Sequence, residues 1–264
     1  MVVQTSYETI KVEVSGAKAV VTLNRPKSLN AMNVQLMKEL AGCLQELSKD
    51  REIKLVVMKG AGGAFSSGGD IKEMLASANE KEFGSIMDSI SQIAITLYSM
   101  PKVTVAAIHG AAAGLGLSLA LASDYVIAEE NSKLAMNFIG IGLIPDGGGH
   151  FFMEQRLGPV KAKQFIWEGR VIEGQEAFMK GLIDEVVAEG RLEESLERFV
   201  TKTLHSPLKA KIKTKQIITE AHRPALIKVL EHEKEGQFLM RQTEDHQEGV
   251  KAFIEKRKPN FTGH

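Results

Sequence analysis

Two glycine-rich turns, residues 64–72 and 109–116, constrain the fold of this chain more than any other feature of its sequence. The first reads AFSSGGDIK and the second HGAAAGLG, and each follows a short apolar run and precedes a segment with a helical pattern. Backbone N–H groups exposed at the start of a helix attract negative charge. Two such turns facing one point would hold an oxyanion from both sides, which is our first functional hypothesis.

The chain around these turns alternates between strand and helix patterns. Strands are predicted over residues 10–14, 19–23, 55–58, 103–108 and 125–128. Amphipathic helices are predicted between them, over 30–50 and 86–100, the second ending at Pro101. Strands separated by helices indicate parallel pairing with right-handed crossovers, so we predict an α/β fold.

The last third of the chain is mostly helical in pattern, with one strand-like run at 183–187. Two long, charged helices are predicted over 207–221 and 224–241, with no strand between them. No Gly/Ser linker interrupts the sequence. We therefore divide the chain into an α/β core, residues 1–200, and a helical region, residues 201–264, that packs on the core or on a neighbouring subunit.

Charge and composition narrow the range of partners. Thirty-three Lys and Arg balance 33 Asp and Glu, so no overall field recruits nucleic acid or an anionic membrane. The single cysteine, Cys43, excludes an intrachain disulfide and suits a reducing compartment. The first eleven residues contain no continuous apolar run, and no segment reaches the roughly 20 apolar residues of a membrane span. We expect a soluble cytoplasmic protein with no membrane or nucleic-acid partner.

Several enzyme classes are excluded by missing motifs. The seven histidines form no His-x-x-x-His pair, and one cysteine cannot build a thiolate site, so no metal is expected. Neither glycine turn ends in the Gly-Lys-Ser/Thr of a phosphate loop, and the second lacks the dinucleotide-binding spacing. The Gly-x-Ser-x-Gly motif of a serine nucleophile is also absent.

Two carboxylates adjoin glycines and have either a catalytic or a purely structural interpretation. Asp70 follows Gly69 at the start of a helix pattern, where it can serve simply as an N-cap. Asp146 lies within LIPDGGGH, residues 143–150, where Pro-Asp-Gly is ordinary turn chemistry. A carboxylate in this position can also lean into a closed pocket, where its pKa rises and it can act as a base. The residues alone leave both interpretations open.

Taken together, these motifs resemble the enoyl-CoA hydratase/isomerase (crotonase) family over essentially the whole chain. The matching segments are LNRPKSLNA (23–31), FSSGGDIK (65–72), VAAIHG (105–110), GLG (114–116), SD (123–124), GLIP (142–145) and the tail from 248 to 261. The resemblance implies a crotonase-like spiral of ββα units. It also implies a helical C-terminal trimerisation region and often a dimer of trimers.

The resemblance further implies how a substrate is held. In the family two backbone N–H groups polarise the carbonyl of an acyl-CoA thioester, and by motif position they map to Gly69 and Leu115. Fixed backbone donors suit a developing enolate oxygen because they need little reorganisation. Coenzyme A arrives as part of the substrate, so no separate cofactor is expected.

The implied substrate- and coenzyme A-binding residues beyond these two are Lys27, Ser67, Asp70, Ile71, Lys72, Phe138, Phe253 and Lys256. Ser67 and Ile71 match family positions whose backbone touches the adenine end of coenzyme A. Lys27, Phe253 and Lys256 match positions near its phosphates. The last two are expected to reach in from an adjoining region or subunit.

The sequence departs from the family pattern at the residues that activate water. Hydratases of the family carry two glutamates, at positions that here hold Ser118 and Phe138. Asp146 instead matches the acid of another branch, the isomerases related to the phenylacetate pathway and the dienoyl-CoA isomerases. A single carboxylate suits isomerisation because it can remove a proton from one carbon and return it two carbons on. An apolar wall at Phe138 would keep water from the dienolate.

We therefore predict an enoyl-CoA isomerase that shifts a carbon–carbon double bond, with Asp146 as acid/base and Gly69 and Leu115 as the oxyanion hole. One alternative is an enoyl-CoA hydratase of fatty-acid β-oxidation that forms 3-hydroxyacyl-CoA, with Asp146 activating water. Another uses Asp146 as a nucleophile, as in the related dehalogenases. The non-enzyme alternative is an acyl-CoA-binding protein that has the two glycine turns but no catalytic activity.

A homo-oligomer, a trimer or a dimer of trimers, is also expected. The predicted helices of the C-terminal region carry apolar residues for which this chain offers no obvious second layer. These residues are Leu226, Ile227, Val229, Leu230, Phe238 and Leu239. We expect this region to form the contacts between subunits.

Overall fold

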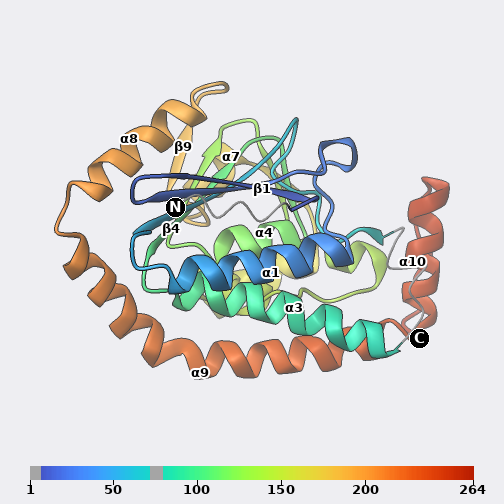
Figure 1. Cartoon of the computed structure of the whole chain (residues 1–264). Helices are drawn as coiled ribbons and strands as arrows, with labels where there is room; N and C mark the ends of the chain where they lie inside the picture. Colours follow the sequence, from blue (N-terminus) through green and yellow to red (C-terminus); the bar gives the residue numbers. More distant parts are fainter. Residues whose placement is uncertain (1–6, 72–79) are drawn as a thin grey trace.

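The computed structural model describes residues 7–71 and 80–264 (Figure 1). The strands are β1 (Ile10–Ser15), β2 (Lys18–Leu23), β3 (Leu55–Gly60), β4 (Val103–Ile108), β5 (Ala111–Ala113), β6 (Tyr125–Glu129), β7 (Lys133–Ala135), β8 (Val171–Glu173) and β9 (Glu185–Val187). The helices are α1 (Val34–Lys49), α3 (Glu80–Ser99), α4 (Leu115–Leu121), α5 (Gly149–Leu157), α6 (Pro159–Glu168), α7 (Gly174–Met179), α8 (Leu192–Leu204), α9 (Leu208–Met240) and α10 (Glu244–Glu255), with 3-10 turns η1 (Pro26–Ser28) and η2 (Asn137–Ile141). None of the described helices has both the length and the apolar character needed to cross a bilayer.

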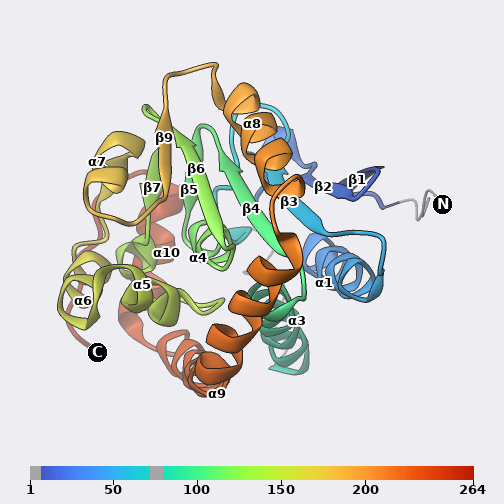
Figure 2. The ribbon, with the colours of Figure 1, turned by 90° about the vertical axis from the view of Figure 1, so that its left-hand side faces the viewer.

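The main sheet has six strands in the order β1-β2-β3-β4-β6-β9 (Figure 2). β1 and β2 form an antiparallel hairpin, and the neighbours from β2 to β9 pair in parallel. A smaller sheet joins β5, β7 and β8. The predicted α/β fold with parallel pairing is confirmed.

Helices cover both faces of the main sheet, as the wholly apolar run at residues 55–58 of β3 predicts. Val56 and Met58 of β3 belong to the large core cluster that also contains residues of α1 and α3. Leu55 and Val57 point the other way, into a second cluster that contains Leu196 of α8. Figure 1 shows α1, α3 and α9 stacked below the main sheet.

The first long helix begins later than predicted. The sequence predicted a helix from Asn30, whereas α1 begins at Val34 with Asn33 as its N-cap, whose side chain accepts from the Leu36 N–H. Asn30 has a left-handed φ of 55° and is fully buried. Its side chain accepts from the Arg25 N–H and donates to the carbonyl oxygens of Ala61 and Ala64. A residue in that conformation cannot continue a right-handed helix, so Asn30 organises the loop instead.

The two long C-terminal helices predicted on either side of residue 223 are one helix. α9 runs unbroken from Leu208 to Met240 with Pro224 inside it. A proline removes one N–H and crowds the carbonyl of the preceding turn, here that of Glu220. Residues 220–225 are all exposed, so water can solvate the freed carbonyl, and the helix continues through the proline.

The apolar face of α9 is partly covered within the chain. Leu226 and Leu230 are buried in the large core cluster, and Val229 packs against that cluster. The expectation that these residues lack a second layer is therefore wrong for this stretch, because α9 packs on α3 and α5. Phe238 and Leu239, near the end of the helix, remain exposed.

Candidate active site

The two glycine-rich turns leave the same edge of the main sheet, because β3 and β4 are parallel neighbours. They are also joined directly. The Ser66 N–H donates to the carbonyl of Ala111 at 2.9 Å, and the Ala113 N–H donates to the carbonyl of Ser66 at 3.0 Å. The convergence of the two turns that the sequence predicted is therefore present.

Glycine at position 68 allows the turns to approach closely. Gly68 has φ +97°, and a β-carbon placed on it would lie 2.8 Å from the carbonyl oxygen of Ala113. The same position is 3.6 Å from the backbone nitrogen of Leu115. The Gly68–Gly69 backbone therefore lies beside the N-terminus of α4.

Both expected oxyanion-hole donors are available. Leu115 is the first residue of α4, where a backbone N–H has no partner within the helix. Within residues 7–71 and 80–264, neither the Leu115 N–H nor the Gly69 N–H donates a hydrogen bond to a described acceptor. Two such donors on adjoining backbone segments are consistent with the expected oxyanion hole, which stays a prediction.

The loop that carries Asp146 packs against the same helix. A β-carbon on Gly147 would lie 2.6 Å from Cδ1 of Leu115 and 3.4 Å from Cβ of Ser118. A β-carbon on Gly149 would lie 2.8 Å from Oγ of Ser118. The tertiary structure thus brings Asp146 to the N-terminal part of α4, next to the second glycine turn.

Asp146 is buried, with only 7% of its surface exposed. Its Oδ2 accepts a long hydrogen bond from Nε2 of Gln237 at 3.5 Å, while Oδ1 has no hydrogen-bond partner among the described residues. Burial raises the pKa of this carboxyl well above its ordinary value of 3.8, and the negative charge of Glu233 raises it further. A buried carboxyl with a raised pKa and one unoccupied oxygen is suited to accept and return a proton.

Glu233 and Gln237, which contact this loop, were not identified from the sequence. Both lie on α9, and each is only 2% exposed. They continue the buried stripe of Leu226 and Leu230 at helical spacing, so the same face carries apolar and then polar residues. Two polar residues at core positions of an amphipathic helix are a signal in the sequence. They indicate that this face of the helix packs against polar groups.

Neither position of the family's hydratase glutamates holds an acid. Ser118 is fully buried, and its hydroxyl donates to the carbonyl of Gly114 at 3.4 Å. Phe138 lies in η2 with its ring about 3.6 Å from the place where a β-carbon on Gly114 would stand. The second glycine turn therefore has an aromatic ring beside it on the side that faces η2.

Some of the residues expected at the adenine end of coenzyme A lie close together. The Ser67 N–H donates to the carbonyl of Leu29 at 2.9 Å, which places it beside η1 and the exposed Lys27. Asp70 forms an ion pair with Arg25 at 2.9 Å. Ile71 is half-buried. Lys72 lies outside the described residues.

Phe253 and Lys256 are separate from this group. Both lie at the end of α10, which packs on η2, and both side chains are exposed. Among the described residues, no hydrogen bond or ion pair links either of them to Lys27 or Ser67. Their expected contact with the phosphates of a substrate stays a prediction.

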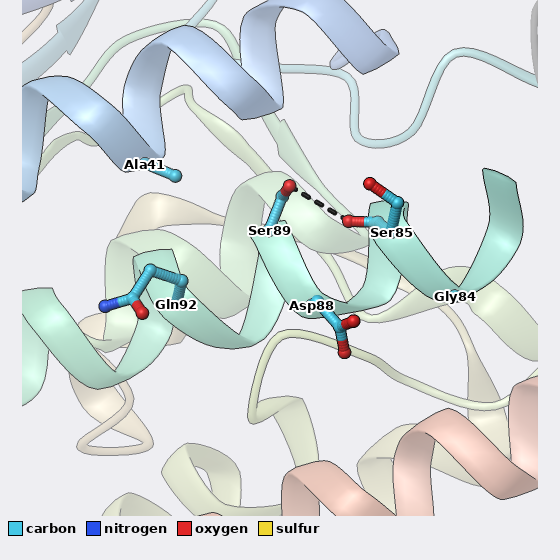
Figure 3. Close-up of a pocket in the computed structure, with 6 residues that line it drawn as sticks. All are labelled: Ala41, Gly84, Ser85, Asp88, Ser89 and Gln92. Atoms are coloured by element: carbon cyan, nitrogen blue, oxygen red, sulfur yellow. Dashed lines mark hydrogen bonds between the residues drawn. The ribbon is translucent and has the colours of Figure 1, made fainter. Parts of the chain in front are cut away.

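A hollow of about 520 Å³ lies between α1 and α3 (Figure 3). Its lining residues are Ala41, Gly84, Ser85, Asp88, Ser89 and Gln92. Asp88 is engaged by Lys234 of α9 in an ion pair of 2.5 Å, and the Ser89 hydroxyl donates to the Ser85 carbonyl. No residue of either glycine turn or of the Asp146 loop lines this hollow. Within the described residues no group of three or more His, Cys, Asp or Glu could hold a metal ion.

Comparison with known proteins agrees with this geometry. A sequence model of the enoyl-CoA hydratase/isomerase family matches residues 13–264. A putative enoyl-CoA hydratase/isomerase of Bacillus subtilis (strain 168) is 46% identical over 254 residues, which cover 96% of this chain and 99% of that protein. The 1,2-epoxyphenylacetyl-CoA isomerase of Escherichia coli (strain K12) is 32% identical over 245 residues, or 92% of this chain and 94% of its own.

A solved structure confirms the predicted crotonase-like fold. An enoyl-CoA hydratase from Mycobacterium avium subsp. paratuberculosis K-10 aligns with a TM-score of 0.88 at 33% identity. The alignment covers 97% of this chain and 100% of that one. Names of both hydratases and isomerases therefore occur among the relatives.

Proposed function

This chain belongs to the enoyl-CoA hydratase/isomerase family, and within that family we propose that it is an enoyl-CoA isomerase with Asp146 as its acid/base. One observation carries the choice. The carboxyl of Asp146 is buried, and among the described residues neither its Oδ1 nor the N–H groups of Gly69 and Leu115 in the nearby turns have a hydrogen-bond partner, while Ser118 and Phe138 cannot activate water. A buried base without a water-activating partner suits transfer of a proton between two carbons.

In the proposed reaction the thioester carbonyl accepts hydrogen bonds from the N–H groups of Gly69 and Leu115. The carboxylate of Asp146 removes a proton from the α-carbon of a 3-enoyl thioester, or from the γ-carbon of a 2-enoyl thioester, and becomes a carboxylic acid. The electron pair spreads into a dienolate that the two N–H groups stabilise. The acid then returns the same proton two carbons along, so the double bond moves and no atom is gained or lost.

The raised pKa of Asp146 fits both halves of this cycle. A carboxyl with an ordinary pKa is a weak base near neutral pH, whereas burial makes its carboxylate form more basic. The side chains of Ile90 and Leu115, which adjoin Gly147, and the ring of Phe138 by Gly114 would exclude water from the dienolate. The isomerase from Escherichia coli among the relatives supports this assignment by name.

The substrate is an acyl-CoA thioester in this proposal, and no separate cofactor is needed. Lys27, Ser67, Asp70, Ile71 and Lys72 would hold the nucleotide end beside the first glycine turn. In a trimer or a dimer of trimers, Phe253 and Lys256 would approach that end from a neighbouring copy of the chain, since within the chain they lie on α10 and directly after it.

Hydration is the second candidate, favoured by the hydratase name of the structure from Mycobacterium avium. Here Asp146 would activate a water molecule that adds to the double bond. The two candidates differ in product, because isomerisation conserves the formula of the substrate and hydration adds one water.

Incubation with matched 2-enoyl- and 3-enoyl-CoA substrates, with the products identified by mass spectrometry, separates the candidates. We expect interconversion of the two enoyl-CoA isomers without formation of 3-hydroxyacyl-CoA.

The variant Asp146→Asn should lower turnover by roughly 10²- to 10⁴-fold, the usual contribution of general acid–base catalysis, with thioester binding nearly unchanged. The control Ser118→Ala should change turnover little. Full activity of Asp146→Asn contradicts the proposal, and hydration faster than isomerisation favours the second candidate.

A further inference from the structure

α9 presents two polar side chains to the Asp146 loop. Glu233 and Gln237 are four residues apart, so they lie on one face of the helix, and both are almost completely buried. Burying polar groups of this kind is unfavourable unless they are hydrogen-bonded. Their partners are all in residues 144–150, which identifies that loop as the reason for their burial.

Gln237 contacts both the backbone before Asp146 and the carboxyl itself. Its Nε2 donates to the carbonyl of Ile144 at 2.5 Å and to Oδ2 of Asp146 at 3.5 Å. One amide group therefore fixes the rotation of the carboxyl relative to the loop. Because Oδ2 faces Gln237, Oδ1 is the oxygen left for a reacting proton.

Glu233 anchors the loop on the other side of Asp146. Its carboxylate accepts hydrogen bonds from the N–H of Gly148 at 2.8 Å and from the N–H of His150 at 3.1 Å, and it pairs with Nδ1 of the His150 ring at 2.8 Å. These N–H groups lie at the start of α5, where negative charge is favourable. The Glu233 side chain is thereby held in place against the loop that carries Asp146.

Glu233 is the charged neighbour that acts on Asp146 from α9, and the half-exposed ring of His150 faces it from α5. Around Gly147 and Gly149 of this loop, α4 contributes Leu115 and Ser118 and α3 contributes Ile90, all of which are uncharged. The negative charge of Glu233 raises the pKa of Asp146 in addition to the effect of burial. Glu233 thus opposes ionisation of the carboxyl that Gln237 orients.

We propose that Gln237 and Glu233 are positioning residues for Asp146, an inference that rests on the proposed acid/base role of that residue. Gln237 holds Oδ2 so that Oδ1 meets the substrate. Glu233 fixes the conformation of residues 146–150 through its hydrogen bonds to their backbone. It also places a second negative charge beside the reacting carboxyl. Neither side chain transfers a proton itself.

The pH profile of kcat/KM for isomerisation tests the role of Glu233. The acid limb reports protonation of the base in the free enzyme. Removing the charge of Glu233 lowers the pKa of Asp146, so the acid limb of Glu233→Gln should move to lower pH. The matched control is Glu235→Gln, the same chemical change at an exposed position of α9, which should leave the limb in place. A Glu233→Gln profile that coincides with the unmodified enzyme overturns this role.

Gln237→Met, which keeps the volume and removes the donor, tests the other half. A mispositioned carboxyl should lower kcat by roughly 10- to 100-fold, while KM changes little because the thioester is held elsewhere. A loss of activity that is fully explained by the fraction of unfolded protein overturns the positioning role. If Glu233→Gln does not fold, the positioning proposal is judged on Gln237→Met alone, by whether kcat falls while KM stays nearly unchanged.

The variant Asp146→Asn separates the two levels of inference. If it is inactive while Glu233→Gln and Gln237→Met behave as the unmodified enzyme, the proposed function stands and the positioning roles fail. If it is fully active, the proposed function itself fails.

Discussion

The guanidinium of Arg25 contacts the carboxylate of Asp70 at 2.9 Å and also donates to the carbonyl of Ala31 at 2.5 Å. This contact ties the loop before η1 to the residue that directly follows Gly69. Both side chains are largely shielded from solvent, with exposed fractions of 20% and 13%. The ion pair therefore fixes the backbone that would carry one half of the oxyanion hole.

Replacing Arg25 by Met should lower turnover by roughly 10- to 100-fold, because a small displacement of the Gly69 N–H misplaces it relative to the substrate oxygen. It should also destabilise the fold by about 1–3 kcal/mol, since the carboxylate of Asp70 loses a partner in a shielded site. Steady-state kinetics and urea unfolding measure the two effects. The control Lys18→Met removes an ion pair with the half-exposed Glu197 and should have little effect on either.

Gly116→Ala should separate the two glycine turns. A β-carbon there would lie 2.8 Å from both Cβ and the carbonyl oxygen of Ser66, so one turn must move away from the other. We expect a destabilisation of about 1–3 kcal/mol and a clear loss of turnover. Gly42→Ala in α1 is the matched control, because its β-carbon would meet nothing within 4 Å. It should stabilise the helix by roughly 0.5–1 kcal/mol. Equal effects of the two substitutions would contradict the close packing of the turns.

The buried carboxyl of Asp146 should make the fold less stable as pH rises. Its pKa in the folded protein lies well above the ordinary value of 3.8 that applies to the unfolded chain. Between these two values the folded state binds more protons than the unfolded state, so stability falls with increasing pH. Asp146→Asn should therefore be more stable than the unmodified protein at neutral and alkaline pH, and the difference should vanish toward pH 4. Unfolding free energies measured across this range test the prediction, and a constant difference would contradict it.

Coenzyme A thioesters should bind, whereas the corresponding free acids should not. The N–H groups of Gly69 and Leu115, which have no acceptor among the described residues, would bind a thioester carbonyl in the proposed site, and the adjoining residues Ser67 to Ile71 would bind a nucleotide. Isothermal titration calorimetry measures the two affinities directly, and bound thioester should raise the thermal unfolding midpoint by mass action. Equal affinity for an enoate and its thioester would refute this expectation.

The assembly should be a trimer or a dimer of trimers with C-terminal helices at the subunit contacts. Leu239 at the end of α9 and Phe253 and Ile254 on α10 are more than half exposed in the single chain. Apolar side chains of this size are favoured at interfaces between subunits. Light scattering at micromolar concentration measures the mass, and Ile254→Glu should shift it toward the monomer. A monomeric unmodified protein would show the expectation to be wrong.

Much of the core could be predicted because its pattern is local. The apolar residues of β3 and the amphipathic spacing of α1 depend on neighbours in sequence, and both segments formed as expected. The departures have long-range or solvent causes. Asn30 leaves the helix because its side chain binds carbonyl groups more than thirty residues away, and α9 passes Pro224 because that turn is exposed.

The candidate site divides in the same way. By itself the sequence determined the two turns with Gly69 and Leu115, and a carboxylate at Asp146 among glycines, because turn chemistry and backbone freedom belong to the residues themselves. Only the tertiary structure decided that Asp146 is buried and that Gln237, 91 residues later, holds one of its oxygens. Burial and charge at a site depend on which distant segments pack there. The pKa of Asp146, and with it the proposed chemistry, follows from that packing and not from the local pattern.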